Sequence, residues 1–337
     1  MRFNKILLLI VCFFVLFSTK TALSAMKEGI PCLMHVHTEG WSDGELTVEQ
    51  VAEAAKRYGY KCVQYSDHGD SFKTVDDFPY YINQINSVNQ NGSFVTFYGR
   101  EITLGNKRNR NNKLSGNDCH INAMSGLQKP FIDGTFHNDS QLKDVLAILK
   151  KEDAIWFWNH PRTCPQWKKW IKSFHGIEVF NEYVTQRDLN YYLEAVGAGW
   201  KGMVIGGMDL HYWGQFGSRI TTFIFADSIT RTSILDNLRK QRSTIATIDV
   251  ASVKVSAAPG SYSFEKSRGR TITISITFNK PIPLARNFEV YHNGSFYSRL
   301  DLVYENNAYH IKFKIPESGS FIFVIPGYLI TSPYWLK

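Results

Sequence analysis

The chain has 337 residues, of which 44% are hydrophobic and 20% are charged, so its composition is that of a globular protein. The formal net charge of +8 includes Arg2, Lys5 and Lys20, and subtracting these three leaves a mildly basic +5 that suits an anionic substrate or surface. No run of Lys and Arg is dense enough to indicate nucleic-acid binding.

Residues 1–25 are expected to be a signal peptide. A basic start precedes a 12-residue apolar run at 6–17 and a small, polar stretch that ends near 25. The run is too short to span a bilayer comfortably, which favours cleavage over an uncleaved anchor. We therefore predict an exported chain, periplasmic or extracellular, with no membrane span after cleavage. Export permits disulfides, but Cys32, Cys62 and Cys119 fall in expected buried strands, so free buried thiols are the preferred interpretation.

From 31 to about 250, short apolar runs alternate with helical segments. In the helix expected at 47–59, Thr47 and Gln50 form a capping box and Gly59 provides a stop. Further helices are expected at 140–151, 186–198 and 232–241, and strands at 31–36, 61–66, 94–102, 119–124, 154–160, 176–181, 202–209 and 221–226. Strands that alternate with helices predict a parallel sheet, and about seven such units favour a small or irregular barrel.

After about 250 the pattern becomes entirely β. Residues 271–278 alternate strictly, as in a half-buried antiparallel strand, and Asn293-Gly294 separates two β-rich runs as in a tight hairpin. Strands at 308–315 and 320–325 follow, without a helical pattern. The expected organisation is a signal peptide (1–25), an α/β barrel (26–255) and a small all-β sandwich-like domain (256–337).

Metal-ligand residue types stand where nearly every expected strand ends. The carboxyl ends of parallel barrel strands converge on one face, so residues distant in sequence would meet there. In an extended strand His35 and His37 would point to the same side, and Asp209 and His211 repeat this spacing. So many imidazoles and carboxylates exceed the needs of one general base and suit two or three divalent ions. The residues are His35, His37, Asp67, His68, Glu101, His120, Asn159, His160, Glu178, Asp209 and His211.

A series of motifs resembles a known family. HVHTEGWSDG (35–44), YSDHGD (65–70), GREIT (99–103), NHP (159–161) and GMDLH (207–211) are similar, in the same order, to the motifs of the polymerase and histidinol phosphatase (PHP) superfamily of metal-dependent phosphoesterases. The later part, with DNLRKQRSTIAT (236–247) before a β domain, looks like the secreted, carbaryl-hydrolase-type branch. The resemblance implies a distorted seven-stranded (β/α) barrel with up to three metals at its C-terminal face.

The resemblance also implies a ligand set. His35 and His37 would bind one metal with Asp209, and Glu101 would bridge it to a second, completed by His120 and His160. Asp43, His68 and His211 would bind a third, although some relatives have histidine where this chain has Asp43. Asp67 and Asn159 are interpreted as groups that orient the ligands, and Glu178 as an orienting group or a substrate contact. Mn, Zn and Fe all accept these ligands.

Substrate contacts are expected around this centre. The basic loop 105–118 contains Lys107, Arg108, Arg110 and Lys113, which would capture a phosphate or belong to a solvated loop. Arg162 and Arg219 would clamp a phosphate or form structural ion pairs. Arg100 is discounted because it points away from Glu101 across its strand. Trp41 and Trp213 stand beside ligand motifs and are candidates for the pocket wall.

Three functions remain open from the sequence. The first is an exported phosphoesterase acting on a small, anionic molecule, in which a metal-bound hydroxide attacks phosphorus. The second is a carbamate, ester or amide hydrolase with the same metal centre. The third is a non-catalytic module in which metals stabilise the fold; the complete set of candidate ligands argues against it.

Overall fold

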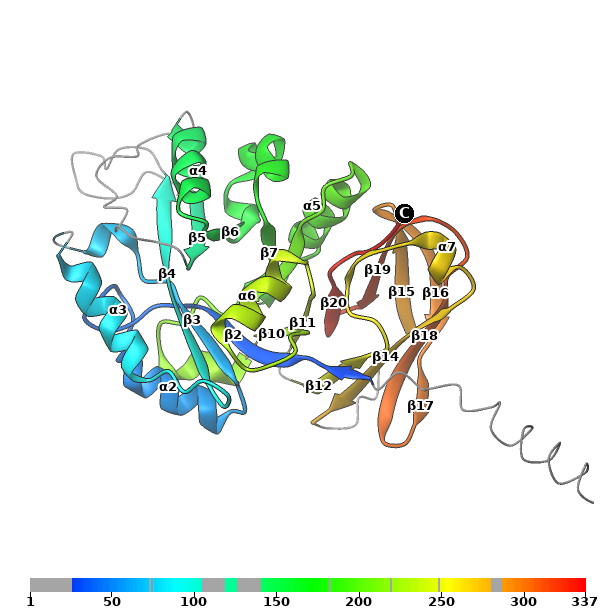
Figure 1. Ribbon diagram of the computed structural model, residues 1–337, viewed down its shortest axis with the longest axis horizontal. Helices are drawn as coiled ribbons and strands as arrows, with labels where there is room; N and C mark the ends of the chain where they lie inside the picture. Colours follow the sequence, from blue (N-terminus) through cyan, green and yellow to red (C-terminus); the bar gives the residue numbers. More distant parts are fainter. Residues whose placement is uncertain are drawn as a thin grey trace, which may run out of the picture.

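The computed structural model describes residues 26–72, 74, 76–104, 119–125, 141–181, 183–218, 220–247, 249–279 and 287–337 (Figure 1). The expected signal peptide, the basic loop 105–118 and Arg219 lie outside these residues. Among the helices of this part of the chain, none is long and apolar enough to cross a membrane.

The first part is a mixed α/β fold with a curled sheet (Figure 1). Its strands are β2 (Ile30–Val36), β3 (Cys62–Tyr65), β4 (Val95–Leu104), β5 (Cys119–Met124), β6 (Ile155–Trp158), β7 (Gly176–Asn181), β8 (Tyr183–Val184), β9 (Met203–Gly207), β10 (Ile220–Ile224) and β11 (Ser243–Thr247). The pairs β2–β3, β3–β4, β6–β7 and β7–β9 are parallel.

The expectation of a wholly parallel sheet is wrong at two places. Strand β5 is antiparallel to both β4 and β6, and β10 is antiparallel to both β2 and β11. A parallel neighbour needs a long crossover, usually a helix, whereas an antiparallel neighbour does not. The sequence predicts no helix between β4 and β5. The absence of a predicted crossover helix was therefore the signal for antiparallel pairing.

Helices flank the curled sheet (Figure 1). They are α2 (Val48–Arg57), α3 (Asp77–Ser87), α4 (Leu142–Lys151), α5 (Gln186–Gly197) and α6 (Arg231–Arg239), with short 3-10 turns η1 (Gly69–Ser71), η3 (Pro161–Thr163), η4 (Pro165–Ser173) and η5 (Trp213–Ser218). The capping box of Thr47 and Gln50 is confirmed, and Gly59, with φ +86°, follows the end of α2. Helix α3 had not been recognised from the sequence.

Strand side chains alternate between two hydrophobic clusters, so the central strands are buried on both faces. Leu33 and Val63 pack with residues of α2, α3, α4 and α5, whereas Cys32, Cys62 and Phe97 belong to the opposite cluster, which includes residues of α6. Packing on both faces leaves the strand ends as the place where polar side chains gather.

Residues 208–210, which follow β9, lie along the end of β2. The backbone N–H of Met208 donates to Met34 O at 2.9 Å, that of Leu210 to His35 O at 3.1 Å, and that of His37 to Leu210 O at 2.9 Å. These bonds bring the end of the α/β part's last parallel strand against its first. The curl therefore draws the carboxyl ends of distant strands together.

The remaining strands form a second part (Figure 1). One five-stranded sheet has the order β1 (Lys27–Glu28), β12 (Val250–Val255), β14 (Thr271–Phe278), β18 (Ala308–Lys314) and β17 (Val303–Glu305). Facing it are β13 (Gly260–Tyr262), β15 (Asn287–His292), β16 (Ser295–Asp301), β19 (Gly319–Ile325), β20 (Leu329–Thr331) and β21 (Tyr334–Leu336). Side chains of both sheets, such as Ile274 and Phe323, form one hydrophobic cluster.

Two local expectations for this part can be compared with the structure. The hairpin at Asn293-Gly294 is confirmed, because β15 and β16 pair around it and both residues have positive φ, 48° and 77°. The expectation of no helix is wrong at α7 (Phe264–Ser267), whose single turn is too short to produce a helical periodicity.

Hydrogen bonds connect the two parts. Strand β20 pairs with β11 in antiparallel register, with Ile330 opposite Ile245, and β1 pairs with β12. The expected boundary at 255 falls between β12 and β13, but β12 itself lies in the sheet with β14. One sheet therefore continues from the α/β part into the C-terminal strands.

The preferred interpretation of free thiols is wrong. The structure contains the disulfides Cys32–Cys62 and Cys119–Cys164, whose Cα atoms are 4.5 and 5.4 Å apart. Cys32 lies directly opposite Cys62 in the parallel β2–β3 pair. Strand register brings these sulfurs together, and register is not visible in the cysteine spacing.

Candidate metal centre

The nine side chains predicted as ligands gather at one end of the curled sheet. They form three overlapping groups, and within each group the ligand atoms lie within 4.8 Å of one another. The groups are His35, His37, Glu101 and Asp209; Glu101, His120 and His160; and His37, Asp43, His68 and His211. The partition is the one implied by the family resemblance, in which Glu101 already bridges the first two groups; His37 additionally joins the third.

The first group is the most deeply buried. The Nε2 atoms of His35 and His37 lie 3.1 and 3.2 Å from Oδ1 of Asp209. Both imidazoles are fully buried, and the Asp209 side chain is 23% exposed. Two nitrogens and a carboxylate oxygen thus face one point.

The expectation that His35 and His37 reach one point is confirmed, but the strand that carries them is not regularly extended. His35 has φ +62°, and the β2–β3 register shifts between Leu33 and Val36, so the strand is bulged where the histidines lie. Asp209 and His160 also have positive φ, 49° and 24°. Such left-handed backbone costs free energy and clusters at functional sites. Asp209 and His211 lie in different groups, as in the ligand set that the resemblance implies.

Glu101 joins the groups. Its Oε1 lies 2.9 Å from Nδ1 of His120 and 3.3 Å from Nε2 of His160, whereas its Oε2 lies 3.3 Å from both Nε2 of His37 and Nδ1 of His68. The carboxylate is almost fully buried. Nε2 of His35 also lies 3.2 Å from Oε1. The two oxygens thus face different sets of imidazoles, an arrangement that suits a carboxylate shared between two cation sites.

The third group opens toward solvent. Asp43 Oδ1 lies 3.2 Å from Nε2 of His211, and Asp43 Oδ2 lies 3.8 Å from Nε2 of His68. The Asp43 side chain is 60% exposed, compared with 19% for His68 and 28% for His211. Exposure therefore rises from the first group to the third, and the accessible side of the centre lies at Asp43.

Glu178 contacts two of the candidate ligands. It is fully buried, and its Oε1 accepts from Nδ1 of His35 at 2.8 Å, while its Oε2 accepts from the backbone N–H of His160 at 2.8 Å. With the proton on Nδ1, the lone pair of His35 Nε2 faces Asp209 and Glu101. Sequence reasoning had left Glu178 as either an orienting group or a substrate contact, and this geometry fits the first of these.

The two other predicted orienting residues act differently from each other. Nδ2 of Asn159 donates to Oε1 of Glu101 at 2.6 Å. Asp67 accepts from the backbone N–H of Thr38 and from the hydroxyl of Ser42, both at 2.6 Å. Asp67 thus anchors the loop after β2. The hydroxyl of Ser42 also lies 3.4 Å from Nδ1 of His37, so Ser42 connects Asp67 to a candidate ligand.

The electrostatics of the centre favour cations. Burial lowers the pKa of His37, but Asp209 and Glu101 outweigh it and raise that pKa to about 10. Burial raises the pKa of Glu101, but the surrounding histidines outweigh it and hold the pKa well below its ordinary value. Asp43, hydrogen-bonded to His211, also has a lowered pKa. Without another cation, protons on imidazoles must neutralise these carboxylates.

Two buried nitrogens test whether metal ions fit. Among the described residues, Nε2 of His37 and Nδ1 of His68 have no hydrogen-bond partner, although carboxylate oxygens lie 3.2 to 3.3 Å away. A buried polar atom without a partner is costly. Divalent cations between these nitrogens and oxygens would satisfy both, so the donor set fits metal ions.

The predicted substrate contacts have other partners where the structure describes them. Arg162 bonds Asp188 at 3.2 Å and Asn181 at 3.1 Å. Trp41 stacks on Phe72 and donates to Gln84, so it packs against α3. Trp213 is exposed beside His211, and its ring contacts Phe216. The remaining predicted contacts, Lys107, Arg108, Arg110 and Arg219, lie outside the described residues.

Arg100, which the sequence places on the opposite side of its strand from Glu101, is fully buried, and its guanidinium lies 3.2 Å from the ring centroid of Phe72. Sequence reasoning missed Asn181 and Thr163. Nδ2 of Asn181 donates to Glu178 at 2.9 Å, and the Thr163 hydroxyl lies 3.0 Å from Nδ1 of His160. Asn181 ends β7, a position where a polar residue could have been noticed.

Comparisons with known proteins bear on the fold. No family model and no curated protein matches the chain. A two-domain protein from Bacteroides vulgatus, described as containing a predicted PHP-like metal-dependent phosphoesterase, aligns with TM-score 0.50 and 19% identity over 92% of this chain and 94% of that one.

Two further solved structures are less similar. A protein from Bifidobacterium adolescentis, provisionally described as a metal-dependent phosphoesterase, has TM-score 0.37 and 15% identity, and covers 54% of this chain and 88% of its own. An amidohydrolase from Chromobacterium violaceum with bound sulfate and no metal has TM-score 0.36 and 12% identity, and covers 53% and 87%. At 19% identity, the likeness to the Bacteroides structure concerns the fold alone.

Proposed function

We propose that this chain is a metal-dependent hydrolase of the PHP superfamily, acting as a phosphoesterase on a small, anionic molecule. One observation carries the proposal: Glu101 presents its two oxygens to two different sets of imidazoles at the end of the sheet, His35, His120 and His160 on Oε1 and His37 and His68 on Oε2. Together with Asp209 and Asp43, this arrangement suits two or three divalent ions. Mn, Zn and Fe are all compatible with these ligands.

The residues have distinct tasks in this proposal. His35, His37 and Asp209 hold the deepest ion, His120 and His160 hold a second through Glu101, and the exposed third group faces incoming substrate. Ions bound there would lower the pKa of water and neutralise phosphoryl oxygens. Glu178 keeps the proton of His35 on Nδ1, and Asn159 keeps Glu101 in place.

The proposed fold is the distorted seven-stranded barrel of this superfamily, followed by the β domain. Strands β2, β3, β4, β5, β6, β7 and β9 would form the barrel wall. The hydrogen bonds from 208–210 to β2 support closure at the metal end. The secreted, carbaryl-hydrolase-type branch remains the proposed placement within the superfamily, on the sequence of 236–247.

We also propose export to the periplasm or the extracellular space. The basic start, apolar run and small residues of 1–25 support cleavage of a signal peptide. The two disulfides support an oxidising compartment, because cytosolic thiols are kept reduced. An anionic substrate is favoured by the basic loop 105–118 that follows Glu101 in sequence.

The test uses the chain from residue 26, loaded with Mn²⁺. Hydrolysis of phosphomonoesters and phosphodiesters is measured beside aryl carbamates and esters, with inorganic phosphate and vanadate as inhibitors. Asp209→Asn removes a ligand of the first group. Asp153→Asn makes the same change at an exposed residue paired with Arg239, and serves as the matched control.

Turnover of phosphate esters that falls more than about 100-fold in Asp209→Asn but not in Asp153→Asn is the expected result, because losing a ligand should exceed the effect of losing an orienting group. Inhibition by phosphate should accompany it. If only carbamates or esters are hydrolysed, the chain is a carbamate, ester or amide hydrolase and not a phosphoesterase. Absence of bound metal in the loaded protein would remove the proposal altogether.

A further inference from the structure

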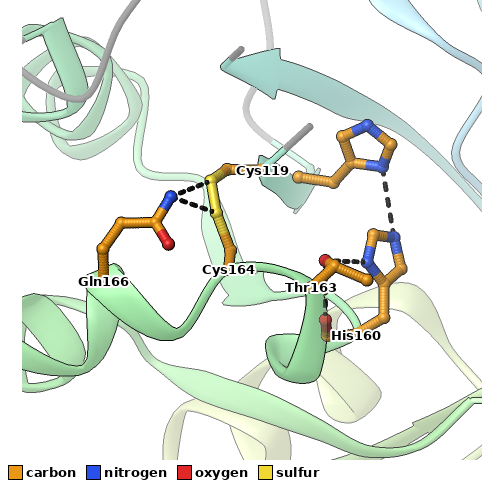
Figure 2. Close-up of a disulfide and its surroundings, with 6 residues drawn as sticks. Cys119, His160, Thr163, Cys164 and Gln166 are labelled. Atoms are coloured by element: carbon orange, nitrogen blue, oxygen red, sulfur yellow. Dashed lines mark hydrogen bonds between the residues drawn. A yellow bond between two sulfur atoms is a disulfide. The ribbon is translucent and has the colours of Figure 1, made fainter. Parts of the chain in front are cut away.

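The Cys119–Cys164 disulfide lies beside one of the three metal groups (Figure 2). Cys119 is the first residue of β5 and immediately precedes His120. Cys164 directly follows η3, the short turn that begins after His160. The bond therefore ties the strand that carries one imidazole of the second group to the turn that carries the other.

The turn that carries His160 is held at both ends. Before the turn, the backbone N–H of His160 donates to Glu178. Within it, the N–H of Thr163 donates to His160 O at 3.0 Å, and the Thr163 hydroxyl lies 3.0 Å from Nδ1 of the ring. After the turn stands the disulfide. A three-residue turn outside the sheet ladder depends on such anchors for its position.

The disulfide is itself fixed. Both cysteines are fully buried, and Nε2 of Gln166 donates to Sγ of Cys119 at 3.1 Å and to Sγ of Cys164 at 3.0 Å (Figure 2). On the ligand side, Nδ1 of His120 lies 3.1 Å from Nε2 of His160. Two imidazole nitrogens this close need a shared proton or a shared cation, so small displacements of either backbone change the spacing that a cation would meet.

We propose that the Cys119–Cys164 disulfide is a positioning element for His120 and His160, so that the metal site of Glu101, His120 and His160 forms only in the oxidised chain. The proposal rests on the proposed function, since it assumes that this group binds metal. The other two groups contain no residue of β5 or η3 and keep their ions when the bond is absent.

The second disulfide provides a matched control. Cys32–Cys62 closes 30 residues and Cys119–Cys164 closes 45, and the entropy of loop closure varies only with the logarithm of length. Removing either bond should therefore cost similar global stability. Cys32 and Cys62, however, already face each other in the β2–β3 ladder, which positions His35 without the bond.

The experiment compares wild type, the double variant Cys119→Ser/Cys164→Ser and the double variant Cys32→Ser/Cys62→Ser, each from residue 26. Mn²⁺ binding is titrated to obtain the number of ions per chain and the affinity of each. The first double variant should bind one ion fewer than wild type, or bind one ion about 10- to 100-fold more weakly, the range seen when groups that orient ligands are lost. The second should match wild type.

A further variant, His160→Ala, identifies which metal group the disulfide affects. His160→Ala already disrupts this group, so adding Cys119→Ser/Cys164→Ser to it should produce no further loss of metal. Equal metal loss in both double variants, or wild-type binding in the first, would overturn the proposal. A wild-type chain that binds no Mn²⁺ would instead refute the proposed function, and the two failures are thereby distinguishable.

Discussion

Glu178→Gln is the sharpest test of how the centre is organised. The change keeps the size of the side chain but replaces one acceptor oxygen with a donor. Glu178 accepts from His35 Nδ1 at 2.8 Å through one oxygen, and through the other from His160 N at 2.8 Å and Asn181 Nδ2 at 2.9 Å. An amide cannot accept on both sides, so one set of contacts must fail.

The two orientations of the amide fail in different ways. If its nitrogen faces His160 and Asn181, donors oppose donors, and a buried group left without a partner costs about 1–3 kcal/mol. If its nitrogen faces His35, the ring must move its proton to Nε2, the nitrogen that faces Asp209. Either orientation also removes a buried negative charge. We expect metal affinity to fall about 10- to 100-fold, which corresponds to about 1.4–2.7 kcal/mol.

The assay is competition for Mn²⁺ against a chelator of known affinity, with denaturant unfolding of the metal-free chain measured in parallel. Glu53→Gln is the control, because Glu53 is exposed and pairs only with Arg57 along α2 in the described ion pairs. Affinity within twofold of wild type in Glu178→Gln, or an equal loss in Glu53→Gln, would show that Glu178 does not orient the ligands.

Two more predictions follow from close contacts. Gly207→Ala should weaken metal binding, because the new Cβ would overlap Oε1 of Glu178 and lie 2.8 Å from Cβ of His35. Both this change and Glu178→Gln disturb the contact between Glu178 and His35, so the double variant should lose little more affinity than either single variant. Additive losses of affinity would contradict this. Burial, with Arg239 nearby, lowers the pKa of His175 to about 4 from 6.5. Below pH 6.5 the unfolded chain binds a proton there that the native chain cannot, so stability should fall by at most about 3 kcal/mol as pH drops to 4. Measured by urea unfolding, the pH dependence of the free energy of unfolding should be smaller in His175→Gln. An unchanged pH dependence would show that His175 is not its source.

Much of the local structure was predictable because its signals are local. The capping box of Thr47 and Gln50 and the Asn293-Gly294 hairpin depend on residues within a few positions of each other. The ligand-type residues could be placed on one face because the strands that carry them end at a shared edge. For this reason the structure brings together residues as distant as His37 and His211.

The sequence predictions that were wrong concern features that depend on pairing between distant segments. The direction of β5 and the register that faces Cys32 with Cys62 are set by which strands meet, which no single segment records. The positive φ of His35 reflects a bulge imposed by its neighbours. Trp41 stands in a ligand motif, yet the aromatic side chains of Phe72, which follows η1, and Tyr81 of α3 bury part of it. A candidate residue near a motif therefore carries less information than one at a strand end.

The β11–β20 pairing limits how this protein can be shortened or recombined. A chain cut at 255 would lose β20, bare the edge of β11 and remove Ile330, Val324 and Trp335 from the cluster that contains Ile245. An unprotected hydrophobic strand edge invites intermolecular pairing. The C-terminal strands thus complete the sheet of the α/β part, and a transfer of the candidate metal centre into another scaffold must include them or supply a substitute edge strand.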